Sequence, residues 1–253
     1  MFRHIFGPVP SRRLGFSLGI DLVPFKTCSL NCVYCECGAT NKLTVERKEY
    51  INYEEVIEEI DIYLTYNNAP DYITFSGSGE PTLNSRIGNI IDYIKNNYSE
   101  IPLAVLTNGT LLHLKEVRKA LLNADLVIPS LDAASEITLK KINRPHNSIK
   151  LYNFLAGLID FRNEFNGQIW LEVFILPDYN DNIEELMLIK ESILKIKPDK
   201  IQINSLDRPG AVPNLLKPSF EQLENIKKLF GLSNVEIISN YKKKTINSFR
   251  KNI

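Results

Sequence analysis

Three of the four cysteines in this 253-residue chain are separated by three and then by two residues. Cys28, Cys32 and Cys35 lie in the segment FKTCSLNCVYCEC, directly after an apolar run. Thiolates at this spacing can bind three corners of one iron–sulfur cube and leave the fourth iron without a protein ligand. We therefore predict a [4Fe-4S] cluster with one open iron, to which a small molecule can bind.

The fourth thiol, Cys37, leaves two other interpretations open. Four thiolates would suit a structural zinc ion, although zinc sites usually use two C-x2-C pairs set well apart. With Cys37 as a fourth ligand, the loop would instead hold a closed cluster that only carries electrons. All four cysteines fall within ten residues, which is too close to join distant parts of a fold. We therefore expect metal binding in a reducing compartment.

The segment FSGSGEPTL, residues 75–83, places small residues and one carboxylate at the end of another apolar run. Glycines such as Gly79 let the backbone approach a ligand closely, and Glu80 offers a carboxylate to a cation. Taken alone, a short glycine motif can equally be a turn that ends a strand. Downstream of a cysteine loop, we interpret Ser78, Gly79 and Glu80 as part of a binding site.

Two further strand ends carry small polar residues. Thr107 and Asn108 end the run VLTN, and Ser130 and Asp132 follow the run VIP. Small polar groups at these places can form hydrogen bonds with a ribose. The alternatives are an ordinary Asn-Gly turn for the first pair and a helix N-cap for the second.

Six other polar residues occupy places where a substrate could be bound, although no motif fixes their roles. Glu172 lies inside the apolar strand IWLEVFI, where a carboxylate is costly unless it faces a polar cavity, and this favours a barrel interior. Asn204 ends the run IQIN, where asparagine commonly forms turns. Guanidinium groups suit phosphates and carboxylates, but most arginines only cover a surface. The cationic candidates are Arg12, Arg13, Arg144 and His146.

The elements that position these residues follow from the periodicity of the apolar residues. Short β-branched runs alternate with longer amphipathic ones, which is typical of successive βα units around a parallel sheet. The predicted strands span residues 18–23, 72–75, 103–107, 126–129, 168–176 and 200–204. The predicted helices span residues 53–67, 86–98, 115–123, 149–164 and 183–196.

Six such βα units predict an α/β fold, either a partial barrel or an open doubly wound sheet. In both architectures, ligands bind at the carboxyl ends of the strands, and the polar motifs fall at these ends. No stretch of Gly, Ser or Pro marks a linker. We predict a single domain over residues 1–253, with an N-terminal extension, 1–17, and a short basic tail, 240–253.

The composition narrows the classes of partner. Thirty basic residues balance thirty acidic ones, so no overall field attracts nucleic acid or an anionic membrane. No apolar run approaches the roughly 20 residues that cross a bilayer, and the N-terminus has none long enough for a signal peptide. We expect a soluble, cytoplasmic protein without a membrane partner. Balanced charge and a single Trp also disfavour a zinc-stabilised RNA-binding protein.

Together these motifs resemble the radical S-adenosylmethionine (SAM) superfamily. The C-x3-C-x2-C spacing, with Tyr34 before the last cysteine, resembles its cluster loop. The run Ser78-Gly79-Glu80 resembles its glycine-glycine-glutamate motif, with Ser78 in place of the first glycine. The resemblance implies a (β/α)6 partial barrel and an open iron that binds SAM.

The resemblance also implies roles for the site residues. Tyr34 would lie near the adenine of SAM, and Glu80 would bind its ammonium group. The strand ends at Thr107, Asn108, Ser130 and Asp132 would contact its sugar and carboxylate. Reductive cleavage of SAM would yield methionine and a 5′-deoxyadenosyl radical that abstracts hydrogen from a substrate, with flavodoxin or ferredoxin as the electron donor.

Longer stretches, among them GPVPSRRLGFSLGIDLVPFKTCSLNCVYC and PSLDAASEITLKKINRPH, resemble an uncharacterised branch grouped with the tRNA wyosine synthases. Those synthases bind a second cluster through additional cysteines, whereas residues 1–27 contain none, so we expect one cluster. The substrate stays open between an RNA base, a peptide and a small metabolite. A glycyl-radical activase is the rival enzyme. An iron–sulfur electron-transfer protein without SAM chemistry is the alternative from another class.

Overall fold

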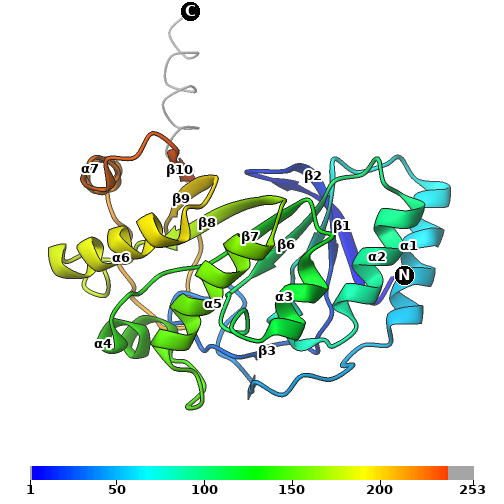
Figure 1. Ribbon diagram of the computed structural model, residues 1–253, viewed down its shortest axis with the longest axis horizontal. Coiled ribbons are helices and arrows are strands. Elements are labelled where there is room, and N and C mark those ends of the chain that lie inside the picture. The colour runs from blue at the N-terminus through cyan, green and yellow to red at the C-terminus, as the bar shows by residue number, and fades with distance from the viewer. Residues whose placement is uncertain (1, 239–253) are drawn as a thin grey trace, which may run out of the picture.

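The computed structural model describes residues 2–238 and consists of an eight-stranded sheet with helices packed against it (Figure 1). The strand order is β1-β2-β5-β6-β7-β8-β9-β10, in which β1 is antiparallel to β2 and every other pair is parallel. The strands of this sheet are β1 (Ile5–Ser11), β2 (Gly15–Ile20), β5 (Tyr72–Phe75), β6 (Leu103–Thr107), β7 (Leu126–Pro129), β8 (Gln168–Phe174), β9 (Lys200–Asn204) and β10 (Val235–Ile238). A second, two-stranded sheet pairs β3 (Thr27–Cys28) with β4 (Lys42–Leu43).

The helices lie between successive strands, as expected for βα units. Several begin at a side chain that caps the first turn, because the first amides of a helix have no partner inside it. Asn52 accepts a hydrogen bond from Glu54 N at the start of α1, and Ser219 forms a capping box with Gln222 at the start of α7. The helices are α1 (Tyr53–Tyr66), η1 (Pro81–Leu83), α2 (Ile87–Asn97), α3 (Lys115–Leu121), α4 (Glu136–Thr138), η2 (Leu139–Asn143), α5 (Leu151–Glu164), α6 (Ile183–Ile196) and α7 (Phe220–Phe230).

The six predicted strands and five predicted helices are all present, but the first strand was misplaced. It runs over Gly15–Ile20 rather than residues 18–23, because Leu22 and Val23 lie beyond the end of the strand and pack in the main core. The other boundaries agree within a few residues, and the fifth strand ends at Phe174 instead of Leu176. The elements that were not predicted are β1, β3, β4, α7 and β10 and the short helices η1, α4 and η2.

The segment 1–17, expected as an N-terminal extension, contributes β1 and the start of β2 to the sheet. Two prolines, Pro8 and Pro10, made residues 5–11 look unlike a strand. Proline lacks the amide that a central strand needs, but it is tolerated at a sheet edge, and β1 is an edge strand whose register shifts between Phe6 and Val9.

The two faces of the sheet have different neighbours because successive side chains of a strand point to opposite sides. One face carries residues such as Phe75, Val105 and Val173 and forms the main core with the helices. The other face holds a small separate cluster to which the β1–β2 turn contributes one residue. This inner cluster consists of Leu14, Ala104, Leu126, Ile128 and Trp170.

The fold is therefore an α/β fold with a mostly parallel central sheet. The predicted basic tail, residues 240–253, lies outside the described residues. None of the helices in the described part of the chain has the length and apolar character needed to cross a membrane.

Candidate active site

The three cysteines of the predicted cluster lie on one loop that begins at the end of β3. Cys28 is the last residue of that strand, and β3 pairs with β4 at the other end of the loop. The amides of Asn31 and Val33 donate to the carbonyl oxygens of Asn143 and Ile142, each at 2.9 Å. The loop is thus fixed at both ends and held against η2 in its middle.

Each of the three thiols has a nitrogen donor next to it. Asn108 Nδ2 lies 3.5 Å from Cys28 Sγ, and Asn143 Nδ2 lies 3.4 Å from Cys32 Sγ. Cys35 Sγ accepts from Lys26 Nζ at 3.0 Å. Hydrogen bonds to the sulfur ligands are one way in which proteins tune an iron–sulfur cluster.

The surroundings affect these thiols unequally. Burial raises the pKa of Cys28 to about 11, and burial also raises the pKa of Cys32. The pKa of Cys35 is lowered to about 5, first through a hydrogen bond from Cys37 and then through Lys26. Cys37 and Lys26 thus favour the thiolate of Cys35, which is the form that binds metal.

Cys37 lies at the outer end of the loop and is exposed. Its Sγ is 4.0 Å from the carbonyl oxygen of Gly77. Among residues 2–238, no three Cys, His, Asp or Glu side chains converge closely enough to hold one metal ion. A zinc ion needs its thiolates at about 2.3 Å from one centre, whereas a cluster binds each thiolate through a different iron. The arrangement suits a cluster better than a single zinc ion.

Glu80 lies next to the cysteine loop, where its amide donates to Thr27 O at 3.1 Å, and it is almost fully buried. Its Oε1 accepts from Thr82 N at 3.1 Å and from the hydroxyls of Thr82 and Thr107, each at 2.6 Å. Within residues 2–238, its Oε2 accepts from Asn108 N alone, at 2.7 Å. Oε2 therefore keeps a lone pair for one more donor.

The carboxylate of Glu80 has no cationic side chain paired with it within the described part of the chain. Burial raises its pKa, and the hydrogen bonds from Thr107 and Thr82 oppose that rise. A buried carboxylate without a cation is costly unless a ligand supplies one. The site thus lacks one positive charge, which an ammonium group of a ligand would provide.

The other residues of the FSGSGEPTL segment hold this loop against the cysteine loop. Gly79 packs so closely on Thr27 that an added Cβ would lie 2.1 Å from the Thr27 carbonyl oxygen. The close approach that we expected Gly79 to offer a ligand is therefore made to the chain itself. Ser78 donates its amide and its hydroxyl to Asp21 Oδ2, at 3.0 and 2.8 Å.

Tyr34, on the cysteine loop, is tied to the end of β7. Its hydroxyl donates to Asp132 Oδ2, and its ring stacks on Phe174 with centroids 3.9 Å apart. Asp132 also accepts from Asn143 Nδ2 at 2.8 Å and from Phe174 N at 3.0 Å. Burial raises the pKa of Asp132 to about 6. Both oxygens of Asp132 therefore accept from protein donors, and Asp132 positions Tyr34.

Thr107, Asn108 and Ser130, predicted from neighbouring strand ends, do lie at one edge of the sheet. Thr107 and Asn108 both bond Glu80, and Asn108 Nδ2 also donates to Ser29 Oγ at 2.9 Å. Ser130 N donates to the Thr107 carbonyl oxygen at 3.1 Å. Hydrogen bonds thus connect the segment FSGSGEPTL to the strand end at Thr107 and Asn108, and that strand end to Ser130.

The residues without a motif divide into two groups. Glu172 lies on the inner side of the sheet, where it pairs with Arg13 and accepts from Asn204 Nδ2 at 3.2 Å. Arg12 pairs with Asp207. By contrast, Arg144 is exposed beyond the end of η2, and His146 bonds Ser148 Oγ at 2.9 Å.

Sequence reasoning missed three residues that support the site: Lys26, Asn143 and Asp21. Lys26 precedes the cysteines by two positions and is 3% exposed, so it is a buried cation next to the thiols. A lysine so near a cysteine cluster was a usable signal. The other two carried none, because their partners become neighbours only in the folded chain.

The donor set fits the predicted group. Three thiols with nitrogen donors, a buried lysine and an uncompensated buried carboxylate surround the loop, which suits a cluster that also binds a charged cofactor. The hydroxyl oxygen of Ser205, at the end of β9, is buried and lacks a hydrogen-bond partner among the described residues.

The family model described as the radical SAM superfamily matches residues 22–189. The chain belongs to the radical SAM superfamily. Within it, the chain is similar to a UPF0026 protein of Methanocaldococcus jannaschii, 35% identical over 249 residues that cover 98% of this chain and 76% of that protein. Proteins of the superfamily use a [4Fe-4S] cluster and SAM.

Two further comparisons bear on parts of larger proteins. A protein named GTPase Obg from Brachyspira hyodysenteriae is 45% identical over 228 residues, which cover 90% of this chain but 33% of that protein. The chain therefore spans about a third of that relative. The structure of Streptococcus suis SuiB bound to S-adenosylmethionine matches 87% of this chain and 46% of SuiB, with a TM-score of 0.58 and 13% identity, a likeness of fold alone.

Proposed function

We propose that this protein is a radical SAM enzyme in which Cys28, Cys32 and Cys35 ligate the [4Fe-4S] cluster. Glu80 is the observation that carries the proposal. It is a buried carboxylate without a cationic partner in the described residues, and Asn108 joins it to Cys28. SAM carries an ammonium group that would balance the negative charge of Glu80 beside the cluster.

The chain's own residues would orient the cofactor. Glu80 Oε2 would accept from the ammonium group, while Thr82 and Thr107 keep the carboxylate in place. Ser130 and Asp132 would contact the sugar and carboxylate end, and Tyr34 would lie near the adenine. When bound, the cluster and SAM supply a 5′-deoxyadenosyl radical for hydrogen abstraction from the substrate.

Several finer statements belong to this proposal as predictions from the sequence. They are a single domain with a (β/α)6 partial barrel, an electron supply from flavodoxin or ferredoxin, and a cytoplasmic location. The grouping with the tRNA wyosine synthases, with an RNA base as one candidate substrate, also depends on the sequence motifs alone. Cys37 would be a thiol outside the cluster, since it is the exposed member of the four.

The test is cleavage of SAM by the cluster-loaded protein. Anaerobically reconstituted protein with dithionite and SAM should release 5′-deoxyadenosine, and Cys32→Ala should abolish the release and lower the iron content. Cys37→Ala is the matched control and should keep both iron and product. Zinc without iron in the wild-type protein, or iron loss in Cys37→Ala equal to that in Cys32→Ala, would contradict the proposal.

A further inference from the structure

A cavity of about 590 Å³ opens on the inner face of the sheet, beside the two loops of the proposed active site. Glu36, which follows Cys35, borders it on the cysteine loop, and Ser76 and Gly77 border it on the loop that precedes Glu80. This volume is within the range of small-molecule sites. A molecule held in the cavity would lie next to both loops.

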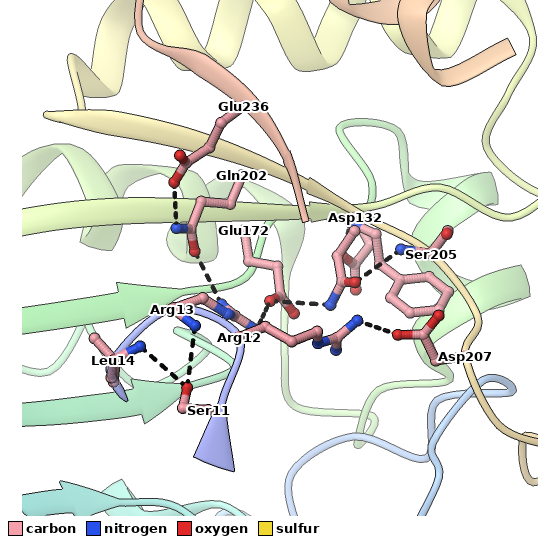
Figure 2. A network of polar contacts seen from close by, with 12 residues as sticks. Ser11, Arg12, Arg13, Leu14, Asp132, Glu172, Gln202, Ser205, Asp207 and Glu236 are labelled. Atoms are coloured by element: carbon pink, nitrogen blue, oxygen red, sulfur yellow. Dashed lines mark hydrogen bonds and ion pairs between the residues drawn. The ribbon is translucent and has the colours of Figure 1, made fainter. Parts of the chain in front are cut away.

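The turn between β1 and β2 covers this cavity and brings two arginines to it. Figure 2 shows that Arg12 pairs with Asp207, which follows β9. Arg13 pairs with Glu172 of β8 and donates to Gln202 of β9. Gln202 in turn donates to Glu236 at 2.7 Å. Arg13 is therefore neutralised and anchored, and we assign it to the wall of the cavity.

The charges of Arg12 and Arg208 are less fully balanced by carboxylates than the charge of Arg13. Asp207, the partner of Arg12, also accepts from Lys217 Nζ at 3.0 Å, so two cations share one carboxylate. Arg208 lies 3.7 Å from Glu36, and its side chain is 79% exposed. An exposed ion pair at that distance contributes little to stability. A ligand anion can therefore replace Glu36 as the partner of Arg208 with little loss of free energy.

The remaining wall is suited to an uncharged part of a ligand. Phe6 and Val9, at the rim, are 41% and 42% exposed. Deeper in the cavity lie the side chains of Leu106 and Ile128 and the hydroxyl of Thr74. Apolar side chains with a few polar groups and a charged side chain are typical of sites for organic molecules.

We propose that this cavity is the substrate site and that its substrate is a small organic anion. The guanidinium groups of Arg12 and Arg208 bind its phosphate or carboxylate, and the apolar wall takes its uncharged part. Guanidinium groups suit both anions through paired N–H donors. The inference rests on the proposed function, since it names the substrate class for the same site.

The test uses three ring compounds that differ in charge: phenyl phosphate, benzoate and benzyl alcohol. Ligand-observed NMR with the cluster-loaded protein should show saturable binding of at least one anion, at least tenfold tighter than that of benzyl alcohol. Comparison of the two anions separates phosphate from carboxylate recognition. The fluorescence of Trp170, the single tryptophan, reports binding independently, because it packs with Leu14 and Ile128 of the cavity wall.

Arg208→Gln should weaken anion binding about fivefold, as expected for an exposed charge contact, and should leave benzyl alcohol unaffected. Arg86→Gln is the matched control, because Arg86 is also exposed and has a long pair of 3.5 Å with Glu49. Equal binding of all three compounds, no saturable anion binding, or no effect of Arg208→Gln would overturn the inference. Release of 5′-deoxyadenosine by the same wild-type preparation tests the proposed function separately.

Discussion

Asp21 accepts two hydrogen bonds from Ser78 through one carboxylate oxygen, which lies 3.0 Å from the amide nitrogen and 2.8 Å from the hydroxyl oxygen. Asp21 follows directly on β2, and Ser78 precedes Gly79 and Glu80. The end of one strand therefore fixes the loop that follows the next strand. Glu80 owes its place beside the cysteines to this contact and to its own amide, which donates to Thr27 O at 3.1 Å.

Asp21→Ala should weaken SAM binding roughly tenfold, because hydrogen bonds to a charged group contribute about 1.5–3 kcal/mol and the freed loop must be ordered again by the ligand. Calorimetric titration of the cluster-loaded protein with SAM measures the effect. Asp71→Ala is the control, since Asp71 similarly accepts from Phe16 N but lies at the opposite end of β5. Equal losses in both variants would show that Asp21 has no specific role.

Glu80→Gln removes the negative charge and keeps the size of the side chain. We expect SAM affinity to fall at least tenfold, whereas 5′-methylthioadenosine, which has no ammonium group, should bind as before. The new amide would face Asn108 N, so stability should also fall by about 1–3 kcal/mol. Parallel titrations with the two nucleosides separate the effects, and equal loss for both would refute an ammonium site.

Gly79→Ala tests the contact between the two loops. The new Cβ would lie 2.1 Å from Thr27 O, which is backbone and cannot turn aside, so β3 must move together with Cys28. We expect a loss of about 3 kcal/mol and a lower iron content after reconstitution. Gly88→Ala is the control, because its Cβ would meet Ala120 at 3.1 Å on a helix surface. Normal iron content in Gly79→Ala would mean that the loops move independently.

Because of Tyr93 and Tyr98, we expect the free energy of unfolding to fall at high pH. Their hydroxyls donate to Asp61 at 2.6 and 2.8 Å. The hydrogen bond to Asp61 raises the pKa of Tyr93 to about 12 from the ordinary value of 10.0, and burial followed by the hydrogen bond raises the pKa of Tyr98 to about 12. The stabilisation is complete below pH 10.0 and is lost as the pH rises through about 12.

Urea denaturation at pH 9 and at pH 11.5 measures this change. Replacing both tyrosines by Phe should destabilise the protein at pH 9 by about 1 kcal/mol, reduced by solvent screening, and should flatten the decline above pH 10. Tyr66→Phe is the control, since Tyr66 is 81% exposed. An unchanged decline in the double variant would contradict the prediction.

The sequence predicted the parts of this molecule that depend on local pattern. Apolar periodicity identified six parallel strands, β2 and β5 to β9, and five of the helices. The strand-end rule brought Glu80, Thr107 and Asn108 to one edge, where the structure has them. Edge strands gave weaker signals. β1 contains two prolines, and β10 has only four residues, VEII, which are too few to distinguish a strand by sequence alone.

Contacts between distant residues could not be predicted in this way. Asn143 donates to Cys32 Sγ from 111 positions away, and it lies in a π-helical turn that no sequence signal announced. The strand-end pattern identified Asp132 but did not show that its two oxygens accept from Tyr34, Asn143 and Phe174. A single sequence shows which residues are polar and does not show which of them already have partners.

The arginines of the β1–β2 turn have a consequence for the order in which the molecule is completed. Arg12 and Arg13 bond Asp207 and Gln202, from which they are 195 and 189 positions apart. During synthesis, the first strands leave the ribosome long before β9 exists, so the hairpin must wait with its guanidinium groups in water. The cavity beneath the hairpin is complete only after Asp207 has emerged, so it cannot enclose a ligand before that point.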